Sequence, residues 1–186
     1  MSQDPLRLVI LTASLQPGRL GPIVTGWFAD RARRRTDLSV DVIDASAELP
    51  PVERSTAART AVGRRLATAD AFVVVTPEYN HSFPGPLKHL IDQYTAEWRA
   101  KPVGFVSYGG ISGGLRAVEQ LRLVFAELHA ATIRNTVSFH RARERFDGDG
   151  NPKDPDSETA ATALLEQLSW WAHALRDART ARPYVA

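Results

Sequence analysis

The sequence AFVVVTPEYN, residues 71–80, decides the fold class. Its first part, Ala71 to Thr76, is the most apolar and branched run in the chain. Such a run is typical of a strand in the middle of a parallel sheet that is covered on both faces. Pro77 ends the run, and a polar, proline-bounded loop follows as far as Gly85. We therefore predict a central parallel strand that carries a long loop at its carboxyl end.

Strand-like and helix-like segments alternate on both sides of this central strand. Short runs rich in branched residues predict further strands over residues 7–12, 39–44, 102–107 and 132–139. Apolar residues at helical spacing predict helices over residues 22–35, 55–69, 86–98, 115–130 and 157–179. Right-handed crossovers between parallel strands place helices on both faces of a sheet. The pattern therefore predicts a doubly wound, three-layer α/β sandwich, with residues 1–186 forming a single domain.

The composition limits the chemistry that the chain can perform. Because the sequence has no cysteine, it can form no disulfide, thiolate nucleophile, iron–sulfur cluster or cysteine-ligated zinc site. The histidines show no metal-ligand spacing, so we expect no metal. No apolar run approaches the roughly 20 residues that cross a bilayer, and the start lacks the pattern of a signal peptide. We therefore expect a cytoplasmic protein that has no membrane partner.

The charge of the chain is mixed, although its pI is about 9.2. The formal net charge is only +2, and the densest basic cluster is Arg31 with residues 33–35. This cluster lies near the end of a predicted helix, where cations complement the helix dipole. We interpret it as a solvated helix end and expect no nucleic-acid partner.

Three loops are expected to form a ligand site. In an open parallel sheet the ligand crevice lies beyond the carboxyl ends of the strands, where the winding direction reverses. The loops at that edge are residues 13–21, 77–85 and 107–114, and each is rich in Gly, Pro, Ser or Asn. Any one of them could be a plain strand-to-helix turn. Their coincidence at one edge is the main physical argument for a site.

The first of these loops suits a phosphate group, because it leads into the N-terminus of a helix. Ser14 could donate a hydroxyl hydrogen bond, Gln16 an amide hydrogen bond and Arg19 a charge-assisted contact. Neither GxxxxGK[ST] nor GxGxxG occurs in the chain, which disfavours a nucleoside triphosphate or a dinucleotide bound in the Rossmann manner. A mononucleotide is therefore the simpler ligand to expect at this loop.

The other two loops suit a flat heteroaromatic ring. Pro77 and Pro84 stiffen the second loop, whose backbone N–H groups could donate to the edge of a flavin while Tyr79 forms a flat wall. The third loop has four glycines within residues 107–114, which permit positive φ angles and a close approach of the backbone to a ligand. His81 could serve as an acid or base, but hydride transfer to a flavin needs no side-chain proton donor. We therefore expect no catalytic side chain.

Two other segments are interpreted as structural. Trp170 and Trp171, together with nearby leucines, are expected to pack the last helix on the sheet. Residues 140–155 contain turn formers without periodicity and are expected to form a surface excursion.

The three loops resemble the motifs of the NADPH-dependent FMN reductase family, a flavodoxin-like group that includes chromate, quinone and azo-dye reductases. TPEYN is intact at residues 76–80 and continues as SFPGPLKHLID, which is similar to the family's S-x-P-G-x-L-K-N-x-I-D. The third loop resembles S-x-G-x-x-G-G. The first loop departs at two places, with Ala13 for the usual Gly and Gln16 for the usual first Arg, which would weaken phosphate binding by one charge-assisted contact. The resemblance spans roughly residues 6–175.

This resemblance implies a flavodoxin-like fold with five strands in the order 2-1-3-4-5. It also implies that FMN is held by Ser14, Gln16, Arg19, Leu20, Gly21, Pro77, Glu78, Tyr79, Asn80, Ser107, Tyr108, Gly109 and Gly110. The implied activity transfers hydride from NADPH or NADH to the bound FMN. A quinone, azo compound, free flavin or other small acceptor then takes the electrons. A homodimer or homotetramer is implied as well, with the helix over residues 85–95 in the interface; an exposed apolar side of that helix would favour it.

Two alternatives stay open from the sequence. The chain could be a flavodoxin-like electron carrier or a flavin-binding regulatory protein, although flavodoxin carriers are usually acidic. It could also be a member of the family that has lost its flavin. The departures at Ala13 and Gln16 would fit that second alternative.

Overall fold

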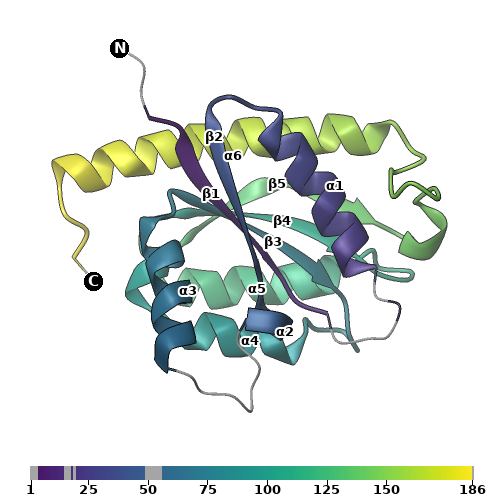
Figure 1. Cartoon of the computed structure of the whole chain (residues 1–186), viewed down its shortest axis with the longest axis horizontal. Coiled ribbons are helices and arrows are strands. Elements are labelled where there is room, and N and C mark those ends of the chain that lie inside the picture. The colour runs from purple at the N-terminus through teal and green to yellow at the C-terminus, as the bar shows by residue number, and fades with distance from the viewer. Residues whose placement is uncertain (1–3, 15–17, 19, 49–55, 186) are drawn as a thin grey trace.

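A parallel five-stranded sheet forms the middle layer of the computed structural model, which describes residues 4–14, 18, 20–48 and 56–185 (Figure 1). The strands are β1 (Leu6–Thr12), β2 (Leu38–Asp44), β3 (Ala71–Pro77), β4 (Pro102–Tyr108) and β5 (Ala131–Phe139). They lie in the order β2-β1-β3-β4-β5, and every neighbouring pair is parallel. The predicted fold class and strand order are therefore confirmed.

The middle strand is the one that the sequence predicts. Every residue of β3 is buried, as is every residue of β4 beside it. A strand with helices on both faces has no side on which a polar side chain could reach water, so only apolar and small residues fit.

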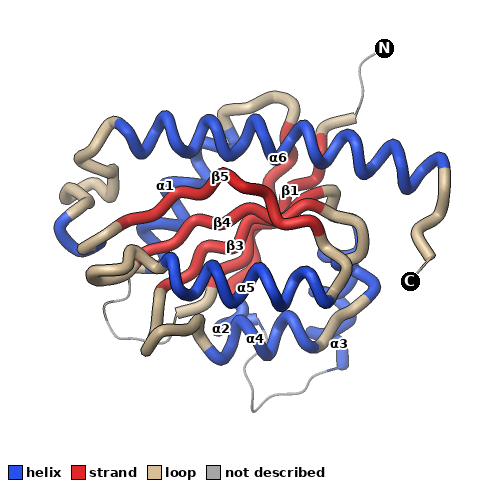
Figure 2. The backbone as a smooth tube through the Cα atoms, turned by 180° about the vertical axis from the view of Figure 1, so that it is seen from behind, coloured by secondary structure: helices blue, strands red, loops and turns tan. Residues whose placement is uncertain are grey.

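Helices cover both faces of the sheet (Figures 1 and 2). On one face, α1 (Gly21–Arg33) and α6 (Asp156–Ala181) pack on Leu8, Ile10 and Val73. On the other face, α3 (Thr56–Thr68), α4 (Gly85–Asp92) and α5 (Leu115–Glu127) pack on the alternate side chains of the same strands, such as Val9 and Phe72. The short elements are α2 (Ala45–Glu48), η1 (Ala96–Trp98) and η2 (Ala142–Glu144).

The register of the strands aligns their carboxyl ends. Pro77 of β3 pairs with Tyr108 of β4, which in turn pairs with Phe139 of β5. The segments that follow these three strands therefore leave the sheet side by side at one edge.

One structural interpretation made from the sequence is wrong. Trp170 and Trp171 do not pack on the sheet, because they are 65% and 39% exposed, whereas Leu164, Leu165 and Leu168 are buried. The leucines and Ala172 form the stripe of α6 that faces the sheet, and the two tryptophans lie off that stripe.

The basic cluster at the end of α1 is partly solvated, as predicted, because Arg33 and Arg34 are exposed, and it also forms ion pairs. Arg31 is 16% exposed and forms an ion pair with Glu158 of α6. Arg33 pairs with Asp30, and Arg35 pairs with Asp37. These pairs engage three of the four arginines in contacts that stabilise the end of the helix.

No helix within the described residues is both long enough and apolar enough to span a membrane.

Candidate functional site

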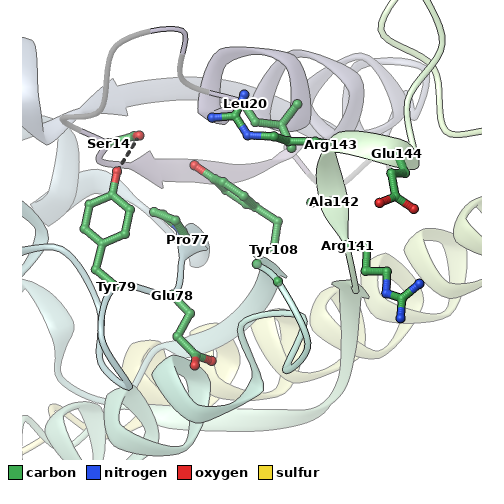
Figure 3. A pocket seen from close by; sticks show the side chains of 12 residues that line it. Ser14, Leu20, Pro77, Glu78, Tyr79, Tyr108, Arg141, Ala142, Arg143 and Glu144 are labelled. Carbon is green, nitrogen blue, oxygen red and sulfur yellow. Dashed lines mark hydrogen bonds between the residues drawn. The ribbon is translucent and has the colours of Figure 1, made fainter.

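A pocket of about 380 Å³ opens at the carboxyl edge of the sheet (Figure 3). Segments that follow β1, β3, β4 and β5 all contribute to it, as expected for an open α/β sheet. Its volume lies within the range of small-molecule sites. Its lining consists of Ser14, Leu20, Pro77, Glu78, Tyr79, Tyr108, Gly109, Gly110, Arg141, Ala142, Arg143 and Glu144.

A hydrogen bond joins the first and second loops at one end of the pocket. The Ser14 and Tyr79 hydroxyl oxygens lie 2.9 Å apart. The backbone N–H of Ser14 also donates to the Ser46 hydroxyl at 3.1 Å. The hydroxyl group of Tyr79 is thus held against the first loop.

Gly21, the first residue of α1, lies against this end of the pocket. A Cβ atom on Gly21 would lie 2.9 Å from the Tyr108 hydroxyl oxygen and 3.3 Å from the Ser14 Cβ. Only glycine allows the helix start to approach both side chains this closely.

The second loop is shaped by a tight turn. Tyr79 and Ser82 form an antiparallel bridge, and their N–H groups donate to each other's carbonyls at 2.8 and 3.0 Å. Asn80 and His81 between them have φ angles of 49° and 71°. Two central residues with positive φ are typical of a type I′ turn, and asparagine tolerates this conformation better than most side chains.

Glu78 joins the second loop to the third. Its side chain is only 6% exposed and pairs with Arg116 at 2.6 Å, while the Ser112 hydroxyl donates to its other oxygen. Desolvation alone would raise the pKa of Glu78, but the hydrogen bonds from Ser112 and Arg116 and the charge of Arg116 outweigh it, so the pKa is lowered. The Glu78 carboxylate therefore stays ionised and holds the two loops together.

The third loop is closed by hydrogen bonds to one carbonyl. The hydroxyl groups of Ser107 and Ser138 both donate to the Gly113 carbonyl, at 2.9 and 2.8 Å. Gly113 and Gly114 have φ angles of 62° and 86°, and a Cβ on either would collide with neighbouring atoms at less than 3 Å. The two glycines required by positive φ are thus Gly113 and Gly114, while Gly109 and Gly110 line the pocket.

The fourth wall was not predicted. Residues 140–155, which the sequence suggested were only a surface excursion, include Arg141 to Glu144, and these line the pocket opposite the second loop. The N–H groups of Arg141 and Ala142 donate to the carbonyls of Gly110 and Gly109, which holds this segment against the third loop. The sequence did contain a sign of this wall. Residues 140–155 follow a predicted parallel strand, so they had to leave the sheet at the same edge as the other loops.

The structure brings together most of the residues that were expected to hold a ligand. Eight of them line the pocket: Ser14, Leu20, Pro77, Glu78, Tyr79, Tyr108, Gly109 and Gly110. Gly21 contacts two of these residues, while Asn80 lies at the tip of the turn and Ser107 is buried behind the third loop. Gln16 and Arg19 lie outside the described residues, so their predicted roles stay predictions.

No histidine is found among the residues that line this pocket. His81 is exposed, and its carbonyl accepts a hydrogen bond from Gln120. No group of three or more His, Asp or Glu side chains that could hold a metal occurs in the described part of the chain.

The sequence of the chain is similar to known reductases. A sequence profile of the family described as NADPH-dependent FMN reductase matches residues 6–144. An NAD(P)H-dependent FMN reductase of Schizosaccharomyces pombe is 31% identical over 120 residues, which cover 58% of this chain and 60% of that protein. A probable NADPH:quinone oxidoreductase of Oryza sativa is 35% identical over 117 residues, covering 60% of this chain and 57% of that protein. The matched part thus spans less than two thirds of either relative.

Solved structures show the same fold. A flavoenzyme NAD(P)H:(acceptor) oxidoreductase of Paracoccus denitrificans superposes with a TM-score of 0.71 at 19% identity, covering 92% of this chain and 98% of that one. A flavodoxin of Streptococcus pneumonia superposes with a TM-score of 0.62 at 17% identity, covering 88% of this chain and 98% of that one. Reductases and flavodoxins share this fold, so the fold alone does not separate an enzyme from an electron carrier.

Proposed function

Because this chain belongs to the NADPH-dependent FMN reductase family, we propose that it holds FMN at the carboxyl edge of its sheet and uses it to oxidise NADPH or NADH. The electrons then pass to a small acceptor such as a quinone, an azo compound or free flavin. The observation that carries this proposal is the pocket that the TPEYN loop and the third loop form together.

The residues present fit the flavin. Pro77 to Tyr79 on one side and Gly109 and Gly110 on the other line the pocket, so a flat ring could lie between the two loops. The N–H groups of Glu78, Tyr79 and Gly109 donate to the carbonyls of Tyr108, Ser82 and Phe139, which leaves the N–H of Gly110 for the edge of the ring. A Cβ on Gly110 would meet no atom within 4 Å, so packing within the chain does not require glycine there. Because glycine has no side chain, the space beside it is open to a ligand. Leu20 and Gly21 stand at the start of α1, and Ser14 after β1 lies beside Gly21. A helix start suits a phosphate, and Gln16 and Arg19 are predicted to add contacts to it.

When bound, FMN supplies the redox chemistry by accepting hydride from the nicotinamide and giving up electrons to the acceptor. The protein's own contribution is position and polarity. The Ser14–Tyr79 hydrogen bond holds the second loop to the first, and the Glu78–Arg116 ion pair holds it to α5. Because these contacts exist before the ligand arrives, less entropy is lost on binding. No side chain of the chain is proposed as an acid, base or nucleophile.

The alternative is a flavin-binding electron carrier or regulatory protein. The family match favours the reductase, because the relatives described above are named as enzymes. Another relative, named a 2-hydroxy-1,4-benzoquinone reductase from a Burkholderia species, is 29% identical over 148 residues and covers 73% of each chain. This likeness supports a small quinone as the acceptor to test first.

Steady-state kinetics separate the two functions. FMN-loaded protein is mixed with NADPH or NADH at several fixed concentrations of 1,4-benzoquinone, and nicotinamide oxidation is followed by absorbance. The reductase should turn over many times, with parallel double-reciprocal plots because the donor leaves before the acceptor binds. Tight FMN binding without multiple turnovers would instead identify a carrier.

A homodimer or homotetramer in the cytoplasm remains a proposal. The apolar residues of α4 give it no support, because Pro86, Leu87, Leu90 and Ile91 are all buried within the chain. The described part of α4 therefore offers no exposed apolar side to a second copy.

A further inference from the structure

We infer that Arg143, which follows β5, binds the phosphate group of the flavin nucleotide. This inference rests on the proposed function, because it assigns a further residue to the same site. It would place the phosphate between the start of α1 and η2, which lie far apart in the sequence.

The first observation is the direction of the Arg143 side chain. Arg143 lies on η2, in the wall of the pocket that follows β5. Figure 3 shows its guanidinium group reaching across the pocket toward Leu20, whereas Arg141 and Glu144 point away from that end. Arg143 thus extends toward the start of α1, where Leu20 directly precedes the helix.

The second observation is that Arg143 is available to bind. Arg143 is exposed, and no carboxylate of the described residues forms an ion pair with it. Arg141 also lines the pocket, but its side chain points away from the start of α1 (Figure 3). Arg116, which lies beyond the third loop, is paired with Glu78.

The third observation is that the backbone beneath Arg143 is fixed. Arg141 has a φ of 48°, and its N–H and that of Ala142 donate to the third loop at 2.8 and 3.0 Å. The Ala142 side chain is buried in the core. A guanidinium group on such a support can form charge-assisted, bidentate hydrogen bonds to phosphate oxygens with little loss of backbone entropy.

The test compares a flavin that carries the phosphate with one that lacks it. Dissociation constants for FMN and for riboflavin are measured by flavin fluorescence on the wild-type protein and on Arg143→Ala. The variant should bind FMN about 10- to 100-fold more weakly, as expected for loss of a hydrogen bond to a charged group, and riboflavin unchanged. Arg143→Lys should retain part of the FMN affinity, because lysine keeps the positive charge but lacks the paired N–H donors of the guanidinium group.

Arg145→Ala is the control for the loss of one charge, since Arg145 lies in the same segment, is exposed and does not line the pocket. Its Nε donates to the His140 carbonyl at 3.0 Å, so this variant also tests whether a looser segment alone would weaken binding. It removes the same charge and should change the FMN affinity less than twofold. A circular dichroism melt confirms that each variant is folded.

Several results would overturn the inference. Equal loss of FMN and riboflavin affinity would show that Arg143 only shapes the pocket. Unchanged FMN affinity would exclude the phosphate contact, and a raised KM for NADPH but not for NADH in the same variant would assign Arg143 to the dinucleotide instead. If the wild-type protein bound neither flavin, the proposed function itself would fail, which is a distinct outcome.

Discussion

Gly21 shows how closely the start of α1 approaches the pocket. A side chain at this position would press on the Tyr108 hydroxyl group and on Ser14, both of which line the site. The glycine therefore helps to shape the pocket, although it does not line it.

Replacing Gly21 with alanine should move Tyr108 and weaken flavin binding. The added Cβ, 2.9 Å from the end of the Tyr108 side chain, should destabilise the fold by about 1 kcal/mol, the low end of the overpacking range. FMN affinity, measured by fluorescence titration, should fall severalfold.

Gly26 on the same helix provides the control, because a Cβ there would meet no atom within 4 Å. Gly26→Ala should stabilise the protein by about 0.5–1 kcal/mol, since glycine in a helix is less favourable than alanine. If both variants kept the wild-type FMN affinity, the close approach at Gly21 would have no bearing on the site.

The limits of prediction are clearest for single side chains. Pro77 and Gly109 could be placed at the pocket from sequence, because topology alone brings the ends of neighbouring strands together. Arg143 could not, because its direction depends on the fold of η2 and on two hydrogen bonds between distant segments. The place of Asn80 at the tip of a turn follows from backbone geometry that the motif does not reveal, and its expected contact with the ligand stays a prediction.

At the scale of elements, the turn between Tyr79 and Ser82 is the smallest unit that shapes the site. Asn80 and His81 both adopt positive φ, and Gln120 of α5 holds the turn through Ser82 and the His81 carbonyl. This turn aims the Tyr79 ring at Ser14.

Asn80→Val should destabilise the fold by about 1–2 kcal/mol, because a branched side chain is strained at a φ of 49°. Asn80→Gly should stay close to wild type, since glycine adopts this conformation without strain. Urea unfolding measures both effects. Equal stability of the two variants would mean that the turn relaxes to another form.

Helices and strands were predicted better than the segments between them. Periodicity located the central strand and the helices, because burial imposes a spacing on apolar residues. The stripe of α6 is the exception. The four-residue spacing of Leu164, Leu168 and Ala172 leaves the adjacent Trp170 and Trp171 outside the contact with the sheet, although their apolar character suggested burial.

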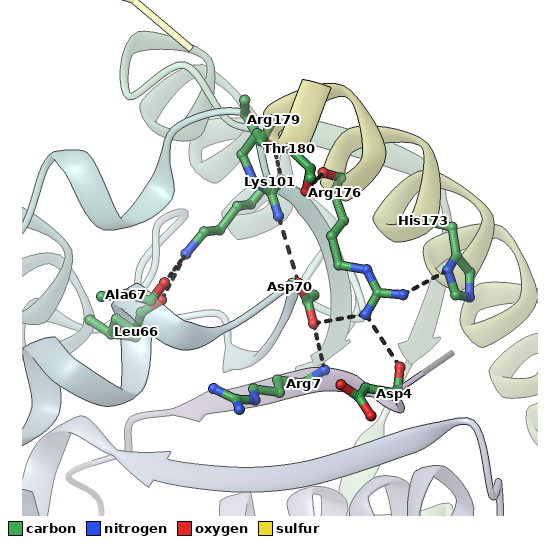
Figure 4. A network of polar contacts seen from close by, with 11 residues as sticks. Asp4, Arg7, Leu66, Ala67, Asp70, Lys101, His173, Arg176, Arg179 and Thr180 are labelled. Carbon is green, nitrogen blue, oxygen red and sulfur yellow. Dashed lines mark hydrogen bonds and ion pairs between the residues drawn. The ribbon is translucent and has the colours of Figure 1, made fainter. Parts of the chain in front are cut away.

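At the scale of the whole molecule, the edge of the sheet opposite the pocket carries a polar network (Figure 4). Lys101 is 6% exposed, and its Nζ donates to the carbonyls of Leu66 and Ala67, both at 2.9 Å. Beside it, Asp70 accepts from the Arg7 N–H and lies 3.6 and 3.7 Å from Arg176 and Arg179 of α6. This network ties α3, β1 and the last helix together.

Burial, reinforced by the charge of Arg179, lowers the pKa of Lys101 to about 8. The unfolded chain holds this proton up to its ordinary pKa of 10.5, so between about pH 8 and 10 the unfolded state binds more protons than the folded state. The free energy of unfolding should therefore rise with pH in that window, by up to about 1.4 kcal/mol per pH unit. Urea unfolding at pH 8 and pH 9.5 measures the slope.

Lys101→Met serves as the reference for this slope. It removes the titrating group while keeping an unbranched side chain, so its stability should depend less on pH across the same interval. A slope shared by both proteins would assign the effect to other groups.

The central claim is that the pocket holds FMN and that a nicotinamide reduces it. The most direct measurement is an anaerobic absorbance spectrum of protein loaded with FMN, washed free of unbound flavin and then mixed with NADPH or NADH. The yellow colour should be retained through the wash and bleached rapidly by one or both nucleotides. Loss of the colour on washing, or retained colour that neither nucleotide bleaches, would contradict the claim.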